Sequence, residues 1–228
     1  MIEEPPLLTV KRRFTRPSPA ALKGFQGVPT SVVCDAQAGR GGMDWRIKPL
    51  EEGASVVGPA LTCWCGPCDN LAALAALELA KPGDVIVVAT DGYEGVAVVG
   101  DRYAAMATKR RLGGLVTDGM LRDRAGIRDA GFLCWGAGLS PNSPYFKGPG
   151  TVGLPVVVGG VTVQSGDLIA ADAEGVVVVP RADLPAVQAA LEQVKANEAR
   201  MERELAAGLD RFEFIGDLLA SPRTRWIE

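Results

Sequence analysis

Histidine is absent from the 228 residues of this chain. Its absence excludes nucleophiles that depend on a neighbouring imidazole, zinc sites built on imidazole, and histidine general bases. Any catalysis must therefore use carboxylates, arginine, lysine, tyrosine, thiols, or a metal ion held by oxygen atoms.

Several other features are scarce. Five cysteines in so long a chain are too few and too unevenly placed for a secreted disulfide framework, so reduced thiols are expected. The net charge of −3, from 24 basic and 27 acidic residues, offers no basic excess for nucleic acid. No segment approaches the roughly 18 apolar residues of a membrane span, and the N-terminal MIEEPPLLTVKRRF has no apolar signal region. These absences predict a soluble, cytoplasmic protein that has a small-molecule ligand and neither nucleic acid nor a membrane as partner.

The thiol motif WCGPC occupies positions 64–68 and is identical to the active-site motif of thioredoxins. Its spacing suits a reversible disulfide, and a helix that starts just after it would lower the pKa of the first thiol. A thioredoxin domain, however, is about half as long and carries the motif near its start, whereas about 60 residues precede it here. The context favours apolar cysteines at the end of a strand.

Short apolar runs separated by glycine dominate the chain from residue 31 onward. We predict strands for SVVCDA, ASVVGPALTCWC, GDVIVVAT, GVAVVG, GGLVTDG, GFLCWG, LPVVVGGVTV and GDLIAADAEGVVVVP. Helices are predicted near 18–25, over 69–81 and over 102–112, which gives a β-α-β-α-β order through the middle of the chain. Because the second half is almost purely β, the pattern predicts a layered α/β domain with an additional β layer.

A long helix is predicted over 182–208. Its seam has a 4-3-4-3-4 spacing typical of a helix packed along a partner. The seam consists of Val187, Leu191, Val194, Glu198, Met201 and Leu205. We divide the chain accordingly into an N-terminal arm with the first helix (1–30), an α/β core (31–181), and a C-terminal helix and tail (182–228).

The segment GGLVTDGMLRD, residues 113–123, carries the first candidate site. An apolar strand runs into an Asp-Gly turn and then presents Arg122 and Asp123 side by side. A guanidinium binds a carboxylate at two points, and an aspartate can hold Mg²⁺ while leaving other positions to water and substrate. The pair therefore suits a substrate that chelates a metal ion through a 2-oxo acid end. The alternative is a surface salt bridge, with Asp123 as the N-cap of a helix in RAGIRDAG.

A second candidate lies in GDRYAAMATKRR, residues 100–111. Gly100 and Asp101 stand at the entry to a predicted helix, where unpaired backbone N–H groups favour an anion. The alternative is an ordinary glycine turn followed by an aspartate N-cap.

The order of these segments resembles the family of 4-hydroxy-4-methyl-2-oxoglutarate/4-carboxy-4-hydroxy-2-oxoadipate aldolases and the related RraA-like proteins. The resemblance covers about residues 30–181 and rests on seven features in order: TSVVCDA, VVGPALT, the Asp69-Asn70 pair, KPGDVIVV, Gly100-Asp101, GGLVTDGMLRD and SGDLIAADAEGVVVVP. It implies an α/β fold, namely the RraA-like swivelling domain of three layers (β/β/α), which in this chain is followed by a C-terminal helix. It also implies assembly into homotrimers or homohexamers.

The resemblance also implies a class II pyruvate aldolase that depends on Mg²⁺ or Mn²⁺. In that family the aspartate matching Asp123 holds the metal ion and the arginine matching Arg122 binds the carboxylate of the pyruvyl group. The loop matching Gly100–Tyr103 supplies backbone amides to the substrate, and the acidic residue matching Asp101 orients water near the metal. This chain departs from the family pattern at Arg102 and Tyr103, where small aliphatic residues are common, and the departure leaves the substrate open.

The expected reaction is retro-aldol cleavage of a 4-hydroxy-2-oxo acid to pyruvate and a second carbonyl product. The metal ion would stabilise the pyruvate enolate, and a water held by Asp101 would take the C4 hydroxyl proton. Oxaloacetate decarboxylation is an expected side activity. A Schiff-base aldolase needs a lysine of lowered pKa, but the seven lysines lie in polar, helical or turn contexts. The alternative from another class is a non-catalytic RraA-like regulator that binds a ribonuclease.

Glu198 is the charged member of the C-terminal seam. A carboxylate in a helix-packing seam is costly unless a cation, a water or a hydrogen-bond donor meets it. Glu198 therefore either pairs with an arginine or turns to solvent, or else the long helix reaches an adjacent subunit and Glu198 acts in that subunit's active site.

Overall fold

The computed structural model describes residues 4–227. Its helices are α1 (Pro19–Lys23), α2 (Thr30–Asp35), α3 (Leu71–Leu79), α4 (Asp101–Lys109), α5 (Arg124–Asp129), α6 (Leu184–Ala206) and α7 (Glu213–Ala220). Its strands are β1 (Leu8–Val10), β2 (Lys48–Pro49), β3 (Val56–Trp64), β4 (Val85–Ala89), β5 (Ala97–Val99), β6 (Gly114–Thr117), β7 (Met120–Leu121), β8 (Cys134–Gly136), β9 (Gly138–Leu139), β10 (Gly150–Val152), β11 (Val156–Val158), β12 (Val161–Val163), β13 (Leu168–Ala171) and β14 (Val176–Val179). None of these helices is long and apolar enough to cross a membrane.

The main sheet has the strand order β1-β10-β3-β4-β6-β8-β2, and β3, β4, β6 and β8 are parallel neighbours. Strand β3 changes partner midway: Val56–Pro59 pair with β13, whereas Ala60–Trp64 pair with β4. The change falls at Pro59, which has no N–H to donate to a ladder. Gly58 is required at this bend, because a Cβ there would stand 2.5 Å from the carbonyl oxygen of Gly83.

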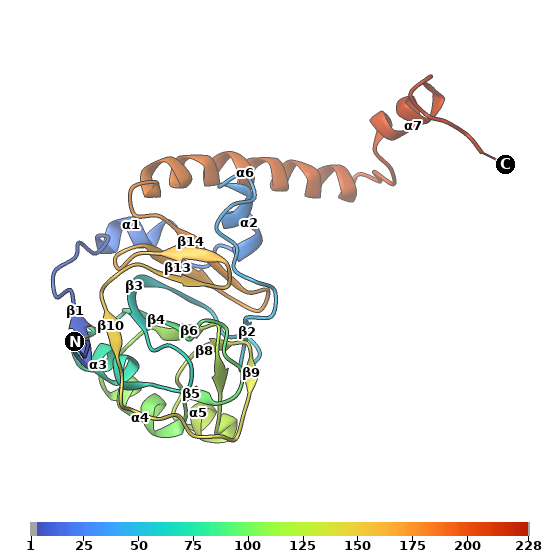
Figure 1. Ribbon diagram of the computed structural model, residues 1–228. Helices are drawn as coiled ribbons and strands as arrows, with labels where there is room; N and C mark the ends of the chain where they lie inside the picture. The colour runs from blue at the N-terminus through green and yellow to red at the C-terminus, as the bar shows by residue number, and fades with distance from the viewer. Residues whose placement is uncertain (1–3, 228) are drawn as a thin grey trace.

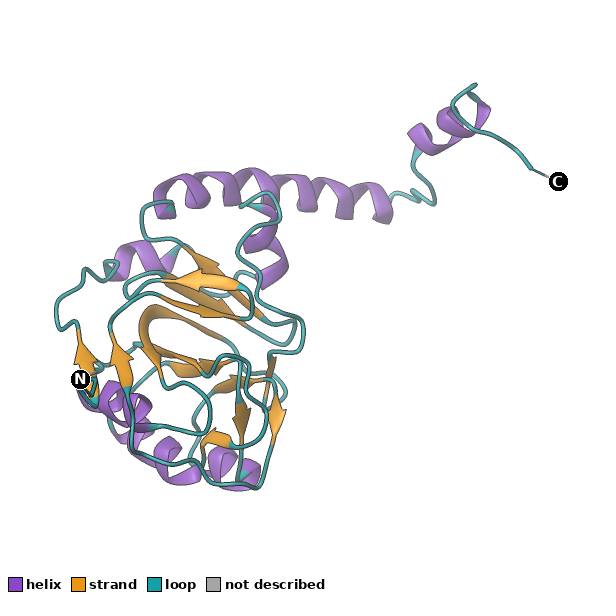
Figure 2. Cartoon of the chain, viewed as in Figure 1, coloured by secondary structure: helices purple, strands orange, loops and turns teal. Residues whose placement is uncertain are grey.

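Three apolar cores separate four layers (Figures 1 and 2). Helices α3, α4 and α5 cover one face of the main sheet, and its other face packs on β11–β14. The β13–β14 hairpin in turn packs on α2 and α6. The residues of β4 alternate between two cores, with Val85 and Val87 in one and Ile86 and Val88 in the other, as expected of a strand buried on both faces. The layered α/β architecture with an additional β layer is confirmed.

Most predicted elements are present, but the strand predicted for SVVCDA is wrong. Residues Thr30–Asp35 form helix α2 instead. Thr30 donates its backbone N–H and its hydroxyl to the carboxylate of Asp172, 2.8 and 2.7 Å away, and so begins the helix. Val32 and Val33 are then buried against β13, β14 and α6. This tertiary contact outweighs the β preference of two adjacent valines.

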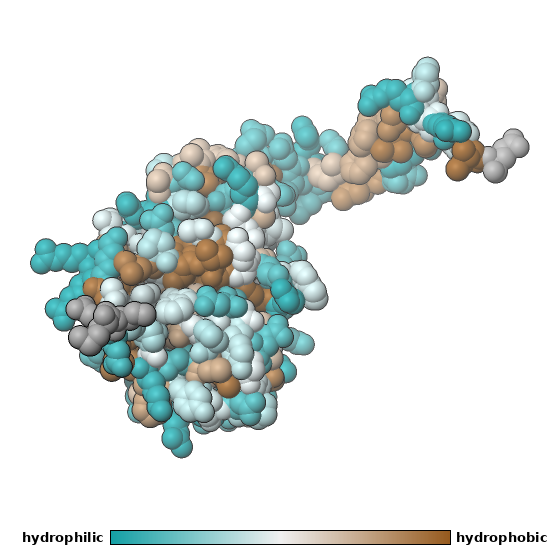
Figure 3. Space-filling model, in the orientation of Figure 1, coloured by the Kyte–Doolittle hydropathy of each residue, from teal (hydrophilic) through white to brown (hydrophobic). Residues whose placement is uncertain are grey.

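The C-terminal extension departs from the body of the domain. The first part of α6 is buried through Val187 and Leu191, but the helix then runs past the domain and Leu205 is 57% exposed. Helix α7, which the sequence pattern did not predict, lies at the far end of this extension (Figure 1). Apolar side chains remain at the surface there, as Figure 3 shows.

Candidate active site

A small three-stranded parallel sheet, ordered β5-β7-β9, positions the candidate site. Gly100, Arg122 and Ser140 each follow directly after one of these strands. Backbone hydrogen bonds fix the ends of the strands, since Arg122 N donates to Val99 O at 3.2 Å and Ser140 N to Leu121 O at 2.9 Å. Because the carboxyl ends of parallel strands share one edge, residues about 20 positions apart meet there.

Gly100 and the Arg122–Asp123 pair are in close contact. The Nε atom of Arg122 lies 3.2 Å from Oδ2 of Asp123, and another guanidinium nitrogen of Arg122 contacts the hydroxyl of Ser143. A Cβ on Gly100 would stand 2.5 Å from Asp123 Oδ2 and 3.0 Å from Arg122 Cγ. Only glycine fits this close to the carboxylate of Asp123 and the side chain of Arg122.

The carboxylate of Asp123 is not used as a helix cap. Asp123 occupies the N-cap position of α5, yet its side chain makes no capping hydrogen bond. Its backbone is left-handed, with φ of 57°, a conformation that aspartate adopts more readily than most residues. Its side chain is 43% exposed. The Asp123 side chain therefore does not cap α5. It forms the partly exposed ion pair with Arg122 that was the other part of this alternative.

The N-terminus of α4 adjoins this pair. Gly100 is the N-cap, and the first intrahelical hydrogen bond runs from Ala104 N to Gly100 O. The backbone N–H groups of Asp101, Arg102 and Tyr103 therefore have no intrahelical acceptor, and Arg102 N donates to Asp101 Oδ1 at 2.7 Å. Asp101 lies in the first turn rather than at the cap. An anion at this end would be favoured by the free N–H groups and by the helix dipole.

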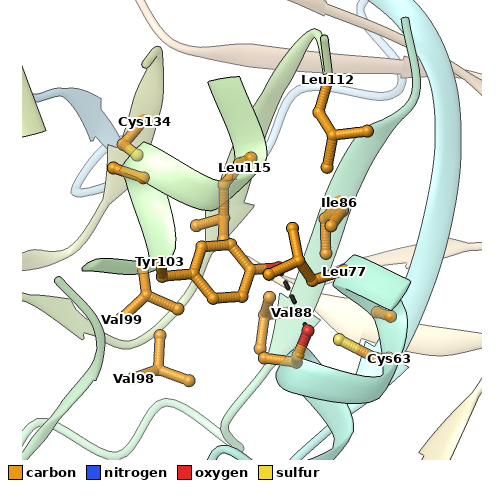
Figure 4. Close-up of a cluster of buried hydrophobic side chains, with 14 of the residues drawn as sticks. Cys63, Leu77, Ile86, Val88, Val98, Val99, Tyr103, Leu112, Leu115 and Cys134 are labelled. Atoms are coloured by element: carbon orange, nitrogen blue, oxygen red, sulfur yellow. Dashed lines mark hydrogen bonds between the residues drawn. The ribbon is translucent and has the colours of Figure 1, made fainter. Parts of the chain in front are cut away.

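The side chain of Tyr103 points away from the site. It is buried between the main sheet and α3, and its hydroxyl donates to Ala73 O at 3.1 Å (Figure 4). Burial raises the pKa of this phenol well above its ordinary value. Any contact of Tyr103 with a ligand is thus limited to its backbone. Arg102, in contrast, is exposed on the surface of α4.

A cavity of about 320 Å³ opens at the pair and includes residues that the sequence reasoning missed. It is lined by Arg122, Asp123, Arg124, Leu139, Ser140 and Pro141. Arg124 forms an ion pair of 3.1 Å with Glu51. The polar run SPNS, which begins at Ser140 directly after an apolar strand, was the signal that could have indicated this loop.

Glu198 lies far from this cavity in its own chain. It is exposed on α6, which runs along the opposite side of the domain from α4 and α5 (Figure 1). The structure thus brings Gly100, Arg122 and Asp123 together, with Asp101 beside them, and leaves Glu198 outside.

The thiols of the WCGPC motif lack the setting of a redox site. Cys65 is 2% exposed at the end of β3, and α3 begins only at Leu71, so no helix starts directly after the motif. All five cysteines are unpaired. Burial raises the pKa of the neighbouring Cys63 thiol, the opposite of what a reactive thiolate needs.

The residues at this site fit a divalent cation that is bound partly by the protein and partly by a ligand. They do not fit a cation whose ligands all come from the protein. Among residues 4–227, no group of three or more Cys, Asp or Glu side chains is arranged to hold a metal ion. Mg²⁺ is commonly bound by one or two carboxylates, with the remaining positions taken by water and substrate oxygens. Asp123 offers such a carboxylate, which makes no capping hydrogen bond and lines the cavity beside Arg122.

The chain is similar to a known protein family. Residues 30–178 match the RraA-like family, described as Aldolase/RraA. The chain is 35% identical, over 80% of its length and 87% of the relative's, to a protein of Halalkalibacterium halodurans named "Putative 4-hydroxy-4-methyl-2-oxoglutarate aldolase".

Two solved structures are also similar to the chain. An uncharacterized protein from Pseudomonas syringae pv. tomato has a TM-score of 0.77 and 26% identity, covering 86% of this chain and 92% of that one. Streptomyces coelicolor RraAS2, described as an unusual member of the RNase ES inhibitor RraA protein family, has a TM-score of 0.73 and 28% identity. The shared region covers 82% of this chain and 100% of that structure.

Proposed function

Because the chain belongs to the RraA-like family (Aldolase/RraA), we propose that it is a divalent-metal-dependent lyase that cleaves a 4-hydroxy-2-oxo acid to pyruvate and a second carbonyl compound. The observation that carries this proposal is the Arg122–Asp123 pair, held against Gly100 at the N-terminus of α4 and open to a cavity. Oxaloacetate decarboxylation is proposed as a side activity, since it needs the same stabilised enolate.

Arg122 binds the carboxylate of the 2-oxo acid in this proposal. Its guanidinium is oriented by Asp123 on one side and by Ser143 on the other, so its orientation is set before the ligand arrives. A planar guanidinium can donate two parallel hydrogen bonds to a carboxylate. The N–H groups of Asp101 and Tyr103, which have no intrahelical acceptor, supply further donors for the oxygen atoms of the substrate.

Asp123 would hold Mg²⁺ or Mn²⁺, as an aspartate with a free carboxylate oxygen can. When bound, the cation supplies Lewis-acid stabilisation of the enolate that forms as the C3–C4 bond breaks. Asp101 carries the proton chemistry. Its carboxylate, beside the α4 N-terminus, accepts the C4 hydroxyl proton through an intervening water molecule, and the proton is then returned to C3 of the enolate to give pyruvate. The absence of histidine leaves a carboxylate as the general base.

A Schiff-base mechanism is disfavoured by the environments of the lysines. All seven are exposed, whereas a nucleophilic lysine needs desolvation or a neighbouring cation to lower its pKa. Borohydride reduction in the presence of pyruvate should leave the mass of the chain unchanged.

The second candidate function is that of a regulator that binds a ribonuclease. The likeness to RraAS2, described as belonging to an RNase ES inhibitor family, supports it. The two candidates differ in one measurement. Only an enzyme raises the rate of pyruvate release from oxaloacetate or from 4-hydroxy-2-oxo acids above that of Mg²⁺ or Mn²⁺ alone, and EDTA should abolish this increase.

The Arg122–Asp123 pair provides the direct test. Asp123→Asn and Arg122→Lys should each lower kcat/KM by at least about 100-fold, since the first removes the anionic ligand and the second replaces a two-point contact with one charge. Pyruvate release is measured with oxaloacetate and with a panel of 4-hydroxy-2-oxo acids.

The chain offers a matched control in α5. Arg128 and Asp129 are another adjacent arginine–aspartate pair, 3.6 Å apart, but both side chains are highly exposed. Arg128→Lys and Asp129→Asn should retain wild-type turnover. Full activity of Asp123→Asn would refute the site, and metal-independent pyruvate release would refute the mechanism.

A further inference from the structure

Helix α7 presents an apolar face that nothing covers among residues 4–227. Phe214, Ile215, Leu218 and Leu219 are all exposed, at 62%, 40%, 37% and 45%. Their spacing of four residues places them in two adjacent rows on one face of the helix. No residue of α7 is buried. Such a face is the anchor pattern of a helix that lies in a groove.

The body of the domain has a groove suited to such a helix, between α3 and α4. It has a volume of about 360 Å³ and is lined by Leu74, Leu77, Glu78, Met106, Lys109 and Arg110. Leu74 is 36% exposed and Met106 is 43% exposed. The floor is thus apolar, and its side chains belong to two helices that are fixed on the main sheet.

Charge on the rim of the groove complements charge on α7. Glu213 and Asp217 stand four residues apart and flank the apolar rows of α7. In the groove, Arg110 is paired with Glu78 at 3.2 Å, which leaves Lys109 as a cation without a carboxylate partner in the described part of the chain. Lys109 offers these two carboxylates a partner that an anionic membrane surface does not, which favours the groove over a lipid surface.

The groove that α7 could occupy is not the one in its own chain. Helix α6 has 23 residues, about 35 Å at 1.5 Å per residue, and it carries α7 away from the domain. Helices α3 and α4 lie on the opposite side of the molecule from α6 (Figure 1). Only the groove of another molecule is within reach of α7 without rearranging α6.

We propose that α7 of one chain docks in the α3–α4 groove of a second copy of this chain. Phe214, Ile215, Leu218 and Leu219 fill the apolar floor, and Glu213 or Asp217 pairs with Lys109. The docked helix is an interaction surface separate from the cavity at Arg122, so the inference does not depend on the proposed function.

Disulfide trapping in the full-length chain tests the contact. Two variants, Leu74→Cys and Leu218→Cys, are produced together in a background in which the two partly exposed thiols, Cys34 and Cys68, are changed to serine. Oxidation with diamide should yield a covalent dimer in which residues 74 and 218 are joined, as identified by mass spectrometry of the linked peptides. Glu204→Cys, on a face of α6 turned away from Glu198, replaces Leu218→Cys in the matched control and should give none.

A charge exchange provides the second measurement. Asp217→Lys and Lys109→Glu should each weaken self-association about tenfold or more, as read from sedimentation velocity over a range of protein concentrations, and the double variant should recover it. Glu204→Lys, which makes the same charge change on a face of α6 turned away from Glu198, should have no effect.

Three results would overturn the proposal. The first is the absence of a 74–218 disulfide when both variants are present in one oligomer. The second is a disulfide between two residues 218, which would show that α7 pairs with α7. The third is binding of the wild type to phosphatidylglycerol vesicles that Leu218→Asp abolishes, without any 74–218 disulfide.

Discussion

At the scale of single residues, the close approach of Gly100 to Asp123 sets the shape of the candidate site. The contact is so close that any side chain on residue 100 would displace either the carboxylate or the guanidinium of Arg122. The glycine is not needed for its backbone conformation, because its φ of −144° is open to all residues. Glycine is needed because the carboxylate of Asp123 and the side chain of Arg122 leave no room for a Cβ atom.

Gly100→Ala should leave the fold intact and lower kcat/KM by about tenfold or more, because the added methyl group would stand 2.5 Å from Asp123 Oδ2. Circular dichroism and pyruvate release are the measurements. Gly216→Ala is the control, since a Cβ there has no neighbour within 4 Å. An active Gly100→Ala enzyme would show that the pair can shift without loss of function.

Tyr103 follows the candidate site residues in the sequence, but in the fold its ring is part of the core. Tyr103→Phe should cost about 1 kcal/mol of stability, because it removes the hydrogen bond to Ala73 O but leaves that carbonyl in its helix. Urea unfolding measures the loss, and KM for oxaloacetate should not change. A large rise in KM at unchanged stability would place the ring in the substrate pocket instead.

At the scale of elements, the end of β3 determines what the WCGPC thiols can do. Cys65 lies in a core directly after the strand ends, and Cys68 is separated from α3 by Asp69 and Asn70, so neither thiol of the motif lies at a helix N-terminus. A disulfide substrate cannot reach a side chain that is 2% exposed, as Cys65 is.

Cys65→Ala combined with Cys68→Ala should therefore leave lyase turnover within a few fold of wild type, with at most a modest loss of stability from the buried position. The wild-type protein should not accelerate the reduction of insulin by dithiothreitol. Thioredoxin-like rates in the insulin assay would contradict this reading of the motif.

At the scale of the whole molecule, α6 connects the α/β domain to α7. Its seam is buried at Val187 and Leu191, whereas Glu198 and Leu205 are exposed, so the charged residue occurs where the helix leaves its own domain. A carboxylate there has no burial cost within one chain. We propose that Glu198 acts in the active site of an adjacent subunit of a trimer or hexamer.

Subunit mixing tests this arrangement. Asp123→Ala and Glu198→Ala should each be inactive, and oligomers assembled from both should recover part of the activity, because some sites would combine an intact Asp123 with an intact Glu198. A mixture of Asp123→Ala with Arg122→Lys is the control and should recover none, since both residues belong to one chain's cavity. Full activity of Glu198→Ala alone would rule out the shared site.

The sequence by itself determined the order of most elements and the chemistry available to the site. The short apolar runs, the helix at 102–112 and the glycine–acid and arginine–aspartate pairs are local patterns. Each can be recognised because its cause lies within a few residues. The lack of histidine excluded whole classes of mechanism for the same reason.

Only the tertiary structure decided which of these residues meet. The β5-β7-β9 sheet joins Gly100 to Arg122 and brings in Ser143, through pairings that no local pattern encodes. Thr30 begins a helix because Asp172, 142 residues away, accepts its hydrogen bonds. Whether the ring of Tyr103 is buried, or the seam of α6 exposed, depends on which elements pack against it. For α7, our proposal places the packing partner in a second copy of the chain. Long-range contacts, whose energies rival local propensities, set these outcomes.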